Sequence, residues 1–407
     1  MLRLAESFAA LREQPFRLLW LGQATSSVGD AMTPVALTFA VLGATGSAGD
    51  LGLVLAGYTL AHAVFILAGG VWSDRLERRL VMLTCDFVRA GAQATLAALV
   101  LVGEPRLWQF MLLAVVVGSA ESFFSPALTG LIPHTVSLER LQQANALIAL
   151  TRSASWVGGP AVSGVVVATA GAGWVFALDA ATFVVSAGFL AALRVPAFPL
   201  GEKQTFLADL AAGWREVRRH GWLWPSLVSF GIGNLAWGAG AVLGPVVAER
   251  ELGGASAWGL IAAGGGVGGV IGGFVALRWR PRRAILVSHL LTLAMGLLVA
   301  AYALPPPTLA LVAASALAFL TIVVGNTLWE TELQARIPRE ALSRVSSYDW
   351  AVSLVFMPLG FAVWGPLSEW IGLEETLLLA AGLLLTAKVA VVLVPEVRHL
   401  ERADADA

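Results

Sequence analysis

The stretch GGVWSDRLERRL at residues 69–80 concentrates charge between two long apolar segments. Five of the six residues from Asp74 to Arg79 are charged, although charged residues make up only 13% of the 407-residue chain. Soluble domains carry about 25% charged residues, and half that share cannot cover a surface that faces water. With 57% hydrophobic residues, the chain is therefore predicted to be a polytopic membrane protein in which this cluster is a loop between two helices.

The composition also argues against several other classes of protein. The formal net charge of −1 leaves no basic surface for a nucleic-acid partner. The single cysteine, Cys85, excludes an intramolecular disulfide framework and a cysteine-rich metal site. The start of the chain is an amphipathic charged segment rather than a signal peptide, and no P-loop for ATP is found. No catalytic or metal-ligand cluster stands out, so we expect neither an enzyme nor a cofactor.

Twelve apolar segments are long enough to cross a membrane, which takes roughly 20 helical residues. Because lipid cannot satisfy free backbone groups, each segment must be a helix. The expected spans are 16–43, 49–73, 80–102, 107–131, 139–168, 174–194, 222–248, 255–279, 284–303, 308–332, 342–369 and 375–395. The predicted fold is an all-α membrane protein of twelve transmembrane helices in two pseudo-symmetric six-helix bundles.

The positions of Lys and Arg predict the orientation, because cytoplasmic loops are enriched in these residues. With a cytoplasmic N-terminus, the outer loops contain only Arg106 and Arg250. Arg89, Arg152 and Lys388 lie within spans, and the other basic residues fall on the cytoplasmic side. We therefore expect both termini in the cytoplasm.

The chain divides into two similar halves around its longest loop. We expect one bundle over 1–194, a cytoplasmic linker with an amphipathic helix over 195–221, and a second bundle with a short tail over 222–407. The segment VGDAM in the first half matches IGNLA in the second, which sets Asp30 opposite Asn234. Duplicated halves suit alternating access, in which two bundles rock about a site between them. Ancestral duplication without transport is the alternative.

Several blocks of sequence carry a family resemblance, among them FRLLWLGQATSSVGD, CDFVRA and ALDAATF. With the opening stretch they resemble the major facilitator superfamily, in particular its bacterial exporter branch of macrolide-efflux and enterobactin-exporter-like proteins, of drug:proton antiporter type. The superfamily signature of the helix 2–3 loop matches at Gly70, Asp74, Arg75, Arg78 and Arg79. The resemblance implies that Asp74 meets the start of the eleventh helix and latches the outward-facing state. Topology alone would also explain the three arginines.

A second motif lies in the fifth span, where Gly159, Pro160 and Gly164 resemble a motif associated with antiporters. Two departures from the family pattern concern the proton pathway. The fourth span has Glu121 and lacks the arginine that many drug:proton antiporters carry there. The second-half counterpart of the opening stretch, ALRWRPRRAIL, keeps the basic residues but has no acid.

Polar residues within spans are costly and therefore mark candidate functional positions. Asp30 and His62 lie at similar depth and form a candidate proton relay, with interhelical hydrogen bonding and packing as their alternative roles. Glu121 and Arg152 are a candidate buried pair. The full candidate proton and substrate pathway comprises Asp30, His62, Glu121, Arg152, Asn145, Asn234 and Asp349. The expected cavity draws on Trp20, Phe39, Asp30, Asn145, Asn234 and Trp237.

Other positions within the spans have more local interpretations. Asp86 and Arg89 are three residues apart near the cytoplasmic interface, where a local salt bridge or snorkelling is expected. Asp179 either guards the outer mouth or supports helix packing, and Lys388 is expected to snorkel inward. Two rows of glycines, Gly264/Gly268/Gly272 and Gly265/Gly269/Gly273, predict close packing of the eighth span.

These patterns predict a secondary active transporter of the bacterial inner membrane. It would export an amphipathic organic compound, such as a drug, an antibiotic or a siderophore-like metabolite, with the proton gradient as its energy source. We expect a monomer whose partners are protons, membrane lipids and a small-molecule substrate. The alternatives are sodium coupling, uptake or facilitated diffusion of a small metabolite, and a transport-inactive receptor or scaffold.

Overall fold

The computed structural model describes residues 9–73, 76–103, 105–194, 214–215, 217–304, 306–337 and 339–402. Every regular element in these ranges is a helix, which confirms the predicted fold class. The chain folds into two units. The first consists of Met1–Gly46 and Gly57–Glu202, and the second of Ser47–Ala56 and Lys203–Ala407. Most of the predicted linker helix, at 195–213, lies outside the described residues.

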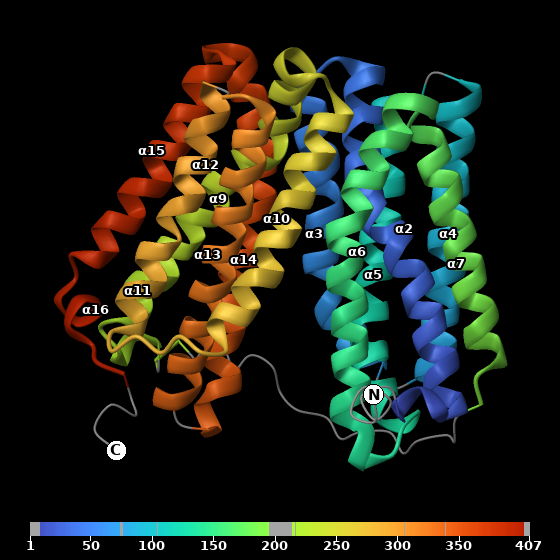
Figure 1. The fold of residues 1–407 in the computed structure, drawn as a ribbon, viewed down its shortest axis with the longest axis horizontal. Coiled ribbons are helices and arrows are strands. Elements are labelled where there is room, and N and C mark those ends of the chain that lie inside the picture. The colour runs from blue at the N-terminus through green and yellow to red at the C-terminus, as the bar shows by residue number, and fades with distance from the viewer. Residues whose placement is uncertain are drawn as a thin grey trace. The chain divides into compact units, whose positions relative to one another are not determined.

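The first unit is a bundle of helices that run side by side (Figure 1). It contains α2 (Gln14–Thr45), most of α3 (Ala48–Ser73), α4 (Arg78–Val102), α5 (Leu107–Leu131), α6 (Leu141–Ala170) and α7 (Ala172–Ala192), with the short helices η1 (Ala9–Arg12), η2 (Ile132–His134) and η3 (Leu138–Arg140). Phe16, Met82 and Phe124 are at the centre of an apolar core that α2, α4 and α5 share.

The second unit is also a helical bundle. It contains α9 (Leu223–Val247), η4 (Ala248–Leu252), α10 (Ala255–Ala276), α11 (Ala284–Leu291), α12 (Leu293–Ala303), α13 (Thr308–Arg336), α14 (Arg339–Ile371), α15 (Leu373–Val392) and α16 (Pro395–His399). A core beside the predicted linker contains Val217, Trp222 and Trp329.

The same helix pairings recur in both units, as duplicated halves require. In the first unit α2 packs on α6 and α7, and in the second unit α9 packs on α14 and α15. In the same way α4 packs on α5 and α7, and α12 packs on α13 and α15. The internal pseudo-symmetry predicted from the sequence is therefore present in the packing.

Within the described residues, 10 helical segments are long and apolar enough to cross a membrane. The other two predicted spans are α6 and α14, whose 30 and 33 residues exceed the roughly 20 that a crossing needs. The span predicted over 284–303 is confirmed as one candidate crossing, and it consists of two helices, α11 and α12, that meet at Thr292. The Thr292 hydroxyl donates to the carbonyl oxygen of His289 at 2.8 Å, which competes with the backbone ladder.

One predicted glycine row brings α10 into close contact with α13. A Cβ at Gly264 would lie 2.7 Å from the carbonyl oxygen of Val312, and a Cβ at Gly268 would overlap the backbone of Ala316. Only glycine permits this approach of two helix backbones. The second row is less uniform, because a Cβ at Gly273 would have no neighbour within 4 Å.

Candidate functional site

Arg89 is the centre of a charged cluster in the first unit. Its side chain is 1% exposed, and one terminal nitrogen lies 2.7 Å from a carboxylate oxygen of Glu121 on α5. The same nitrogen lies 3.7 Å from Asp30 on α2, and the other terminal nitrogen lies 2.9 Å from Asp86, one turn earlier on α4. Three carboxylates from three helices therefore share one guanidinium.

Two aromatic rings fix the position of this guanidinium. The central carbon of Arg89 lies 4.2 Å from the ring centroid of Phe124 on α5 and 4.3 Å from that of Phe183 on α7. A planar guanidinium can stack on aromatic faces while its in-plane N–H groups bind carboxylates. Arg89 is thus held by packing as well as by charge.

The three carboxylates differ in their access to the outside of the unit. The side chain of Asp86 is fully buried, whereas that of Glu121 is 28% exposed and that of Asp30 is 43% exposed. Of the three, Asp30 and Glu121 are therefore the acids that a ligand or solvent can reach without a change in packing. Asp86 serves as the fixed counter-ion of Arg89.

The structure rearranges the pairs expected from the sequence. The predicted salt bridge between Asp86 and Arg89 is present, and both side chains are buried. The expected pair of Glu121 and Arg152 is not formed. Glu121 binds Arg89 because α5 packs directly on α4, while Arg152 is exposed on α6.

His62 and Asp30 do not form the direct relay that similar depth suggested. His62 stacks on Tyr58 in α3, with the ring planes 5° apart and the centroids 6.5 Å apart, whereas Asp30 faces Arg89. Among the described residues, no hydrogen bond or ion pair joins the two. Asn145 is exposed on α6, and no hydrogen bond among the described residues links it to the charged cluster.

Asp179 supports helix packing, one of its two predicted roles. It is fully buried, and its carboxylate accepts hydrogen bonds from Thr33 at 2.8 Å and from Gln93 at 2.7 Å. Thr182 donates to its other oxygen at 3.3 Å. Gly29 leaves the space that the carboxylate occupies, because a Cβ there would overlap Asp179. The carboxylate therefore ties α2, α4 and α7 together.

The helix 2–3 loop motif contributes two described arginines. Asp74 and Arg75 lie outside the described residues, and Gly70 falls within α3. Arg78 donates to the carbonyl oxygen of Gly130 at 2.7 Å, near the end of α5. Arg79 donates to the carbonyl oxygens of residues 190 and 191 at 3.4 and 3.2 Å, where α7 ends, and pairs with Glu77. Both arginines therefore donate hydrogen bonds to carbonyl groups at the C-terminal ends of helices within the first unit.

The antiporter-like motif is a packing site between α6 and α2. A Cβ at Gly159 would lie 2.6 Å from the Cβ of Ala31, the residue after Asp30. Pro160 lies inside α6, and four residues beyond Gly159 the hydroxyl of Ser163 donates to the carbonyl oxygen of Met32 at 2.7 Å. The segment that ends at Gly164 thus holds the α2 backbone beside the charged cluster.

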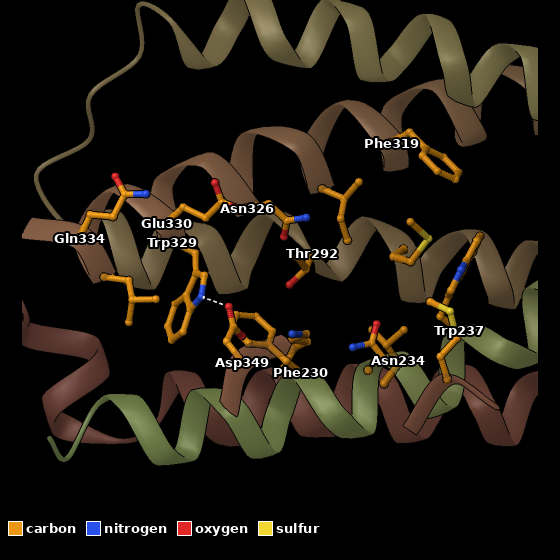
Figure 2. Close-up of a pocket in the computed structure, with 17 residues that line it drawn as sticks. Phe230, Asn234, Trp237, Thr292, Phe319, Asn326, Trp329, Glu330, Gln334 and Asp349 are labelled. Atoms are coloured by element: carbon orange, nitrogen blue, oxygen red, sulfur yellow. Dashed lines mark hydrogen bonds between the residues drawn. The ribbon is translucent and has the colours of Figure 1, made fainter. Parts of the chain in front are cut away.

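The second unit contains a cavity of about 530 Å³. Figure 2 shows Asn326, Glu330 and Gln334 on one side of it, and Asn234 with Asp349 on the other. The first three are four residues apart on α13 and exposed, so they form a polar stripe along that helix. Aromatic side chains complete the wall at Phe230, Trp237, Phe319 and Trp329.

Charged groups in this cavity have distinct environments. Asp349 accepts a hydrogen bond from the indole nitrogen of Trp329 at 3.0 Å. Lys388 is 3% exposed, and its ammonium nitrogen lies 4.4 Å from the ring centroid of Phe230. Of the six residues expected to line a cavity, this one contains Asn234 and Trp237, whereas its lining does not include Trp20, Phe39, Asp30 or Asn145. It also contains Asp349 of the predicted pathway and Lys388, which was expected to snorkel inward.

The polar stripe of α13 was missed by the sequence reasoning, although a signal was present. The segment NTLWETELQ places polar side chains at intervals of four residues within an apolar span, a pattern typical of a helix that faces a cavity. Among the described residues, no group of three or more His, Cys, Asp or Glu side chains is arranged to hold a metal ion.

Comparisons with known proteins agree with this architecture. The profile of a family described as transmembrane secretion effector matches residues 5–407. The chain is 28% identical to the multidrug efflux pump Tap of Mycolicibacterium fortuitum, over 96% of this chain and 98% of Tap. It is 29% identical to the enterobactin exporter EntS of Salmonella typhimurium, over 89% of this chain and 87% of EntS.

A solved structure supports the same fold. The crystal structure of the nucleoside transporter NupG superposes with a TM-score of 0.72, over 94% of this chain and 98% of NupG. The two sequences are only 14% identical, so this likeness concerns the fold alone.

Proposed function

Because the chain belongs to the transmembrane secretion effector family, an exporter branch of the major facilitator superfamily, we propose that it exports an amphipathic organic compound in exchange for protons. It is a multi-pass bacterial membrane protein of a transporter family, and its substrate is a small molecule. Full-length similarity to a multidrug efflux pump and to an enterobactin exporter supports export as the direction.

The same proposal covers the location, orientation, oligomeric state and energy source of the protein. The protein resides in the inner membrane with both termini in the cytoplasm, because the outer loops carry so few basic residues. It works as a monomer by alternating access and takes its energy from the proton gradient, without a cofactor. It has neither an enzymatic activity nor a nucleic-acid partner.

The charged cluster around Arg89 is the observation that carries proton coupling. With all three carboxylates ionised, the cluster would hold two more negative than positive charges between membrane-spanning helices. An uncompensated charge in such a place is costly. Asp30 is the most exposed of the three acids and is the group proposed to carry the exchanged proton, which would relieve part of the excess. Release of this proton on the other side of the membrane would complete the exchange.

Everted membrane vesicles test this proposal. A resistance panel of antibiotics of several classes and enterobactin, in an efflux-deficient host, first identifies an exported compound. In everted vesicles an acidic lumen should then drive accumulation of the radiolabelled compound, because protons leave as it enters. A sodium gradient applied without a pH gradient should drive none.

Variants assign the coupling to the cluster. Asp30→Asn should abolish accumulation that depends on the pH gradient while it leaves membrane insertion unchanged. Glu374→Gln removes an exposed acid near the start of α15 and serves as the control, with accumulation equal to that of the unmodified protein. Accumulation that is indifferent to pH would refute antiport, and full activity of Asp30→Asn would remove Asp30 from the pathway.

A further inference from the structure

The cavity of the second unit contains a buried cation that proton exchange at Arg89 does not use. Lys388 extends from α15 into the wall of this cavity. Gly233 on α9 lies beside it, and a Cβ there would make an ordinary van der Waals contact with the Cε of Lys388 at 3.6 Å. The side chain is only 3% exposed, although it lies four residues before the end of α15.

The described residues compensate this positive charge only in part. The ring of Phe230 provides a cation–π contact, and no described carboxylate forms an ion pair with the ammonium group. Asp349 is engaged by the indole of Trp329, and Glu330 is exposed on the polar stripe. A cation–π contact replaces only part of the hydration that a buried ammonium group loses. Asp349 and Glu330 also line the cavity, so the ammonium group of Lys388 is the place in it where an added anion is favoured.

The groups around Lys388 describe what kind of anion would fit. Phe230 and Trp237 on α9 present aromatic side chains to the cavity, and Asn326 on the polar stripe of α13 can form hydrogen bonds. A cavity of about 530 Å³ has the size of sites that take drug-sized compounds, which range over roughly 300–1,000 Å³.

We propose that Lys388 binds the anionic group of an aromatic organic acid, so that this cavity is the anion subsite of the exported compound. The aromatic body of the compound packs against Phe230 and Trp237, and the polar stripe of α13 binds its remaining polar groups. This proposal rests on the proposed export function and specifies its substrate class.

Two probes that differ only in charge test the proposal. 2-Naphthoate is an anion at neutral pH, and 2-naphthamide is its neutral counterpart of nearly equal shape. Binding of each to the purified full-length protein in detergent is measured by isothermal titration calorimetry. The unmodified protein should bind naphthoate at least tenfold more tightly than naphthamide. Equal affinity for the two probes, or the absence of binding, would overturn the proposal without any variant.

Three variants test whether Lys388 causes the preference for naphthoate over naphthamide. Lys388→Gln and Lys388→Met should bind both probes equally, whereas Lys388→Arg keeps the charge and should keep the preference. Melting temperatures verify that each variant is folded. A tenfold preference that survives in Lys388→Gln would overturn the proposal even if the antibiotic and enterobactin panel shows export. Failure of the unmodified protein to export any compound would instead refute the proposed function.

Discussion

Replacing Arg89 with methionine tests whether the charged cluster depends on its single cation. Methionine keeps much of the side-chain length but leaves Asp86 buried without a counter-ion. Removing one partner of a buried ion pair costs about 3–5 kcal/mol. Glu121 and Asp30 are partly exposed, so their lost pairs add only about 0–1 kcal/mol each. Arg89→Met should therefore lose about 3–7 kcal/mol of unfolding free energy, most of it through Asp86.

Second substitutions separate these contributions. The double variant Arg89→Met/Asp86→Asn removes the buried charge together with its partner, and should recover most of the lost stability. Arg89→Met/Glu121→Gln should recover much less, because the Glu121 carboxylate can be solvated. Unfolding of the full-length protein by SDS in mixed micelles, followed by circular dichroism, measures all four free energies.

The reasoning would be refuted by either of two results. Arg89→Met could unfold within about 1 kcal/mol of the unmodified protein, which would mean that no buried charge depends on it. Alternatively, Glu121→Gln could restore more stability than Asp86→Asn, which would place the main pair at the accessible acid.

Three further changes test packing and hydrogen bonding. Gly268→Ala should lower the free energy of unfolding by about 1–3 kcal/mol, because its Cβ would overlap the α13 backbone. Gly273→Ala is the control and should leave the free energy of unfolding unchanged. Equal melting temperatures of the two variants would contradict the close packing. Arg79→Ala should lower the free energy of unfolding in SDS by about 1 kcal/mol, because carbonyl groups at the end of α7 lose their hydrogen-bond donor. Unchanged stability would show that water replaces the Arg79 side chain as the donor. Asp349→Leu should lower the free energy of unfolding by about 1–3 kcal/mol, because it leaves the indole N–H of Trp329 unpaired. The double variant Asp349→Leu/Trp329→Phe removes the donor as well and should recover this stability. Absence of recovery would contradict that hydrogen bond.

Helix number and limits followed from the sequence because they depend on averages over many residues. Hydropathy over about 20 residues locates each span, and no single side chain decides it. The break at Thr292 escaped this reasoning, since one hydroxyl that binds the carbonyl oxygen of His289 changes no average. Membrane orientation remains a prediction from the positions of Lys and Arg.

The partners within the site could be predicted only in part. Depth in the membrane can be counted along a sequence, and it singled out Asp30 and Glu121, which both lie beside Arg89 in the structure. The direction in which a helix face points depends on packing against its neighbours, so depth could not show that Glu121 faces Arg89 rather than Arg152. The contact of Lys388 with Phe230 escaped the sequence for the same reason, because it depends on how α15 packs on α9.

The two rings that stack on Arg89 have an evolutionary consequence. Lysine would keep the charge at this position, but its ammonium group cannot stack as a plane on Phe124 and Phe183 while it reaches three carboxylates. Single-step drift from arginine to lysine should therefore be selected against. Homologues that lack this arginine should also lack Asp86, so the two positions should be substituted together.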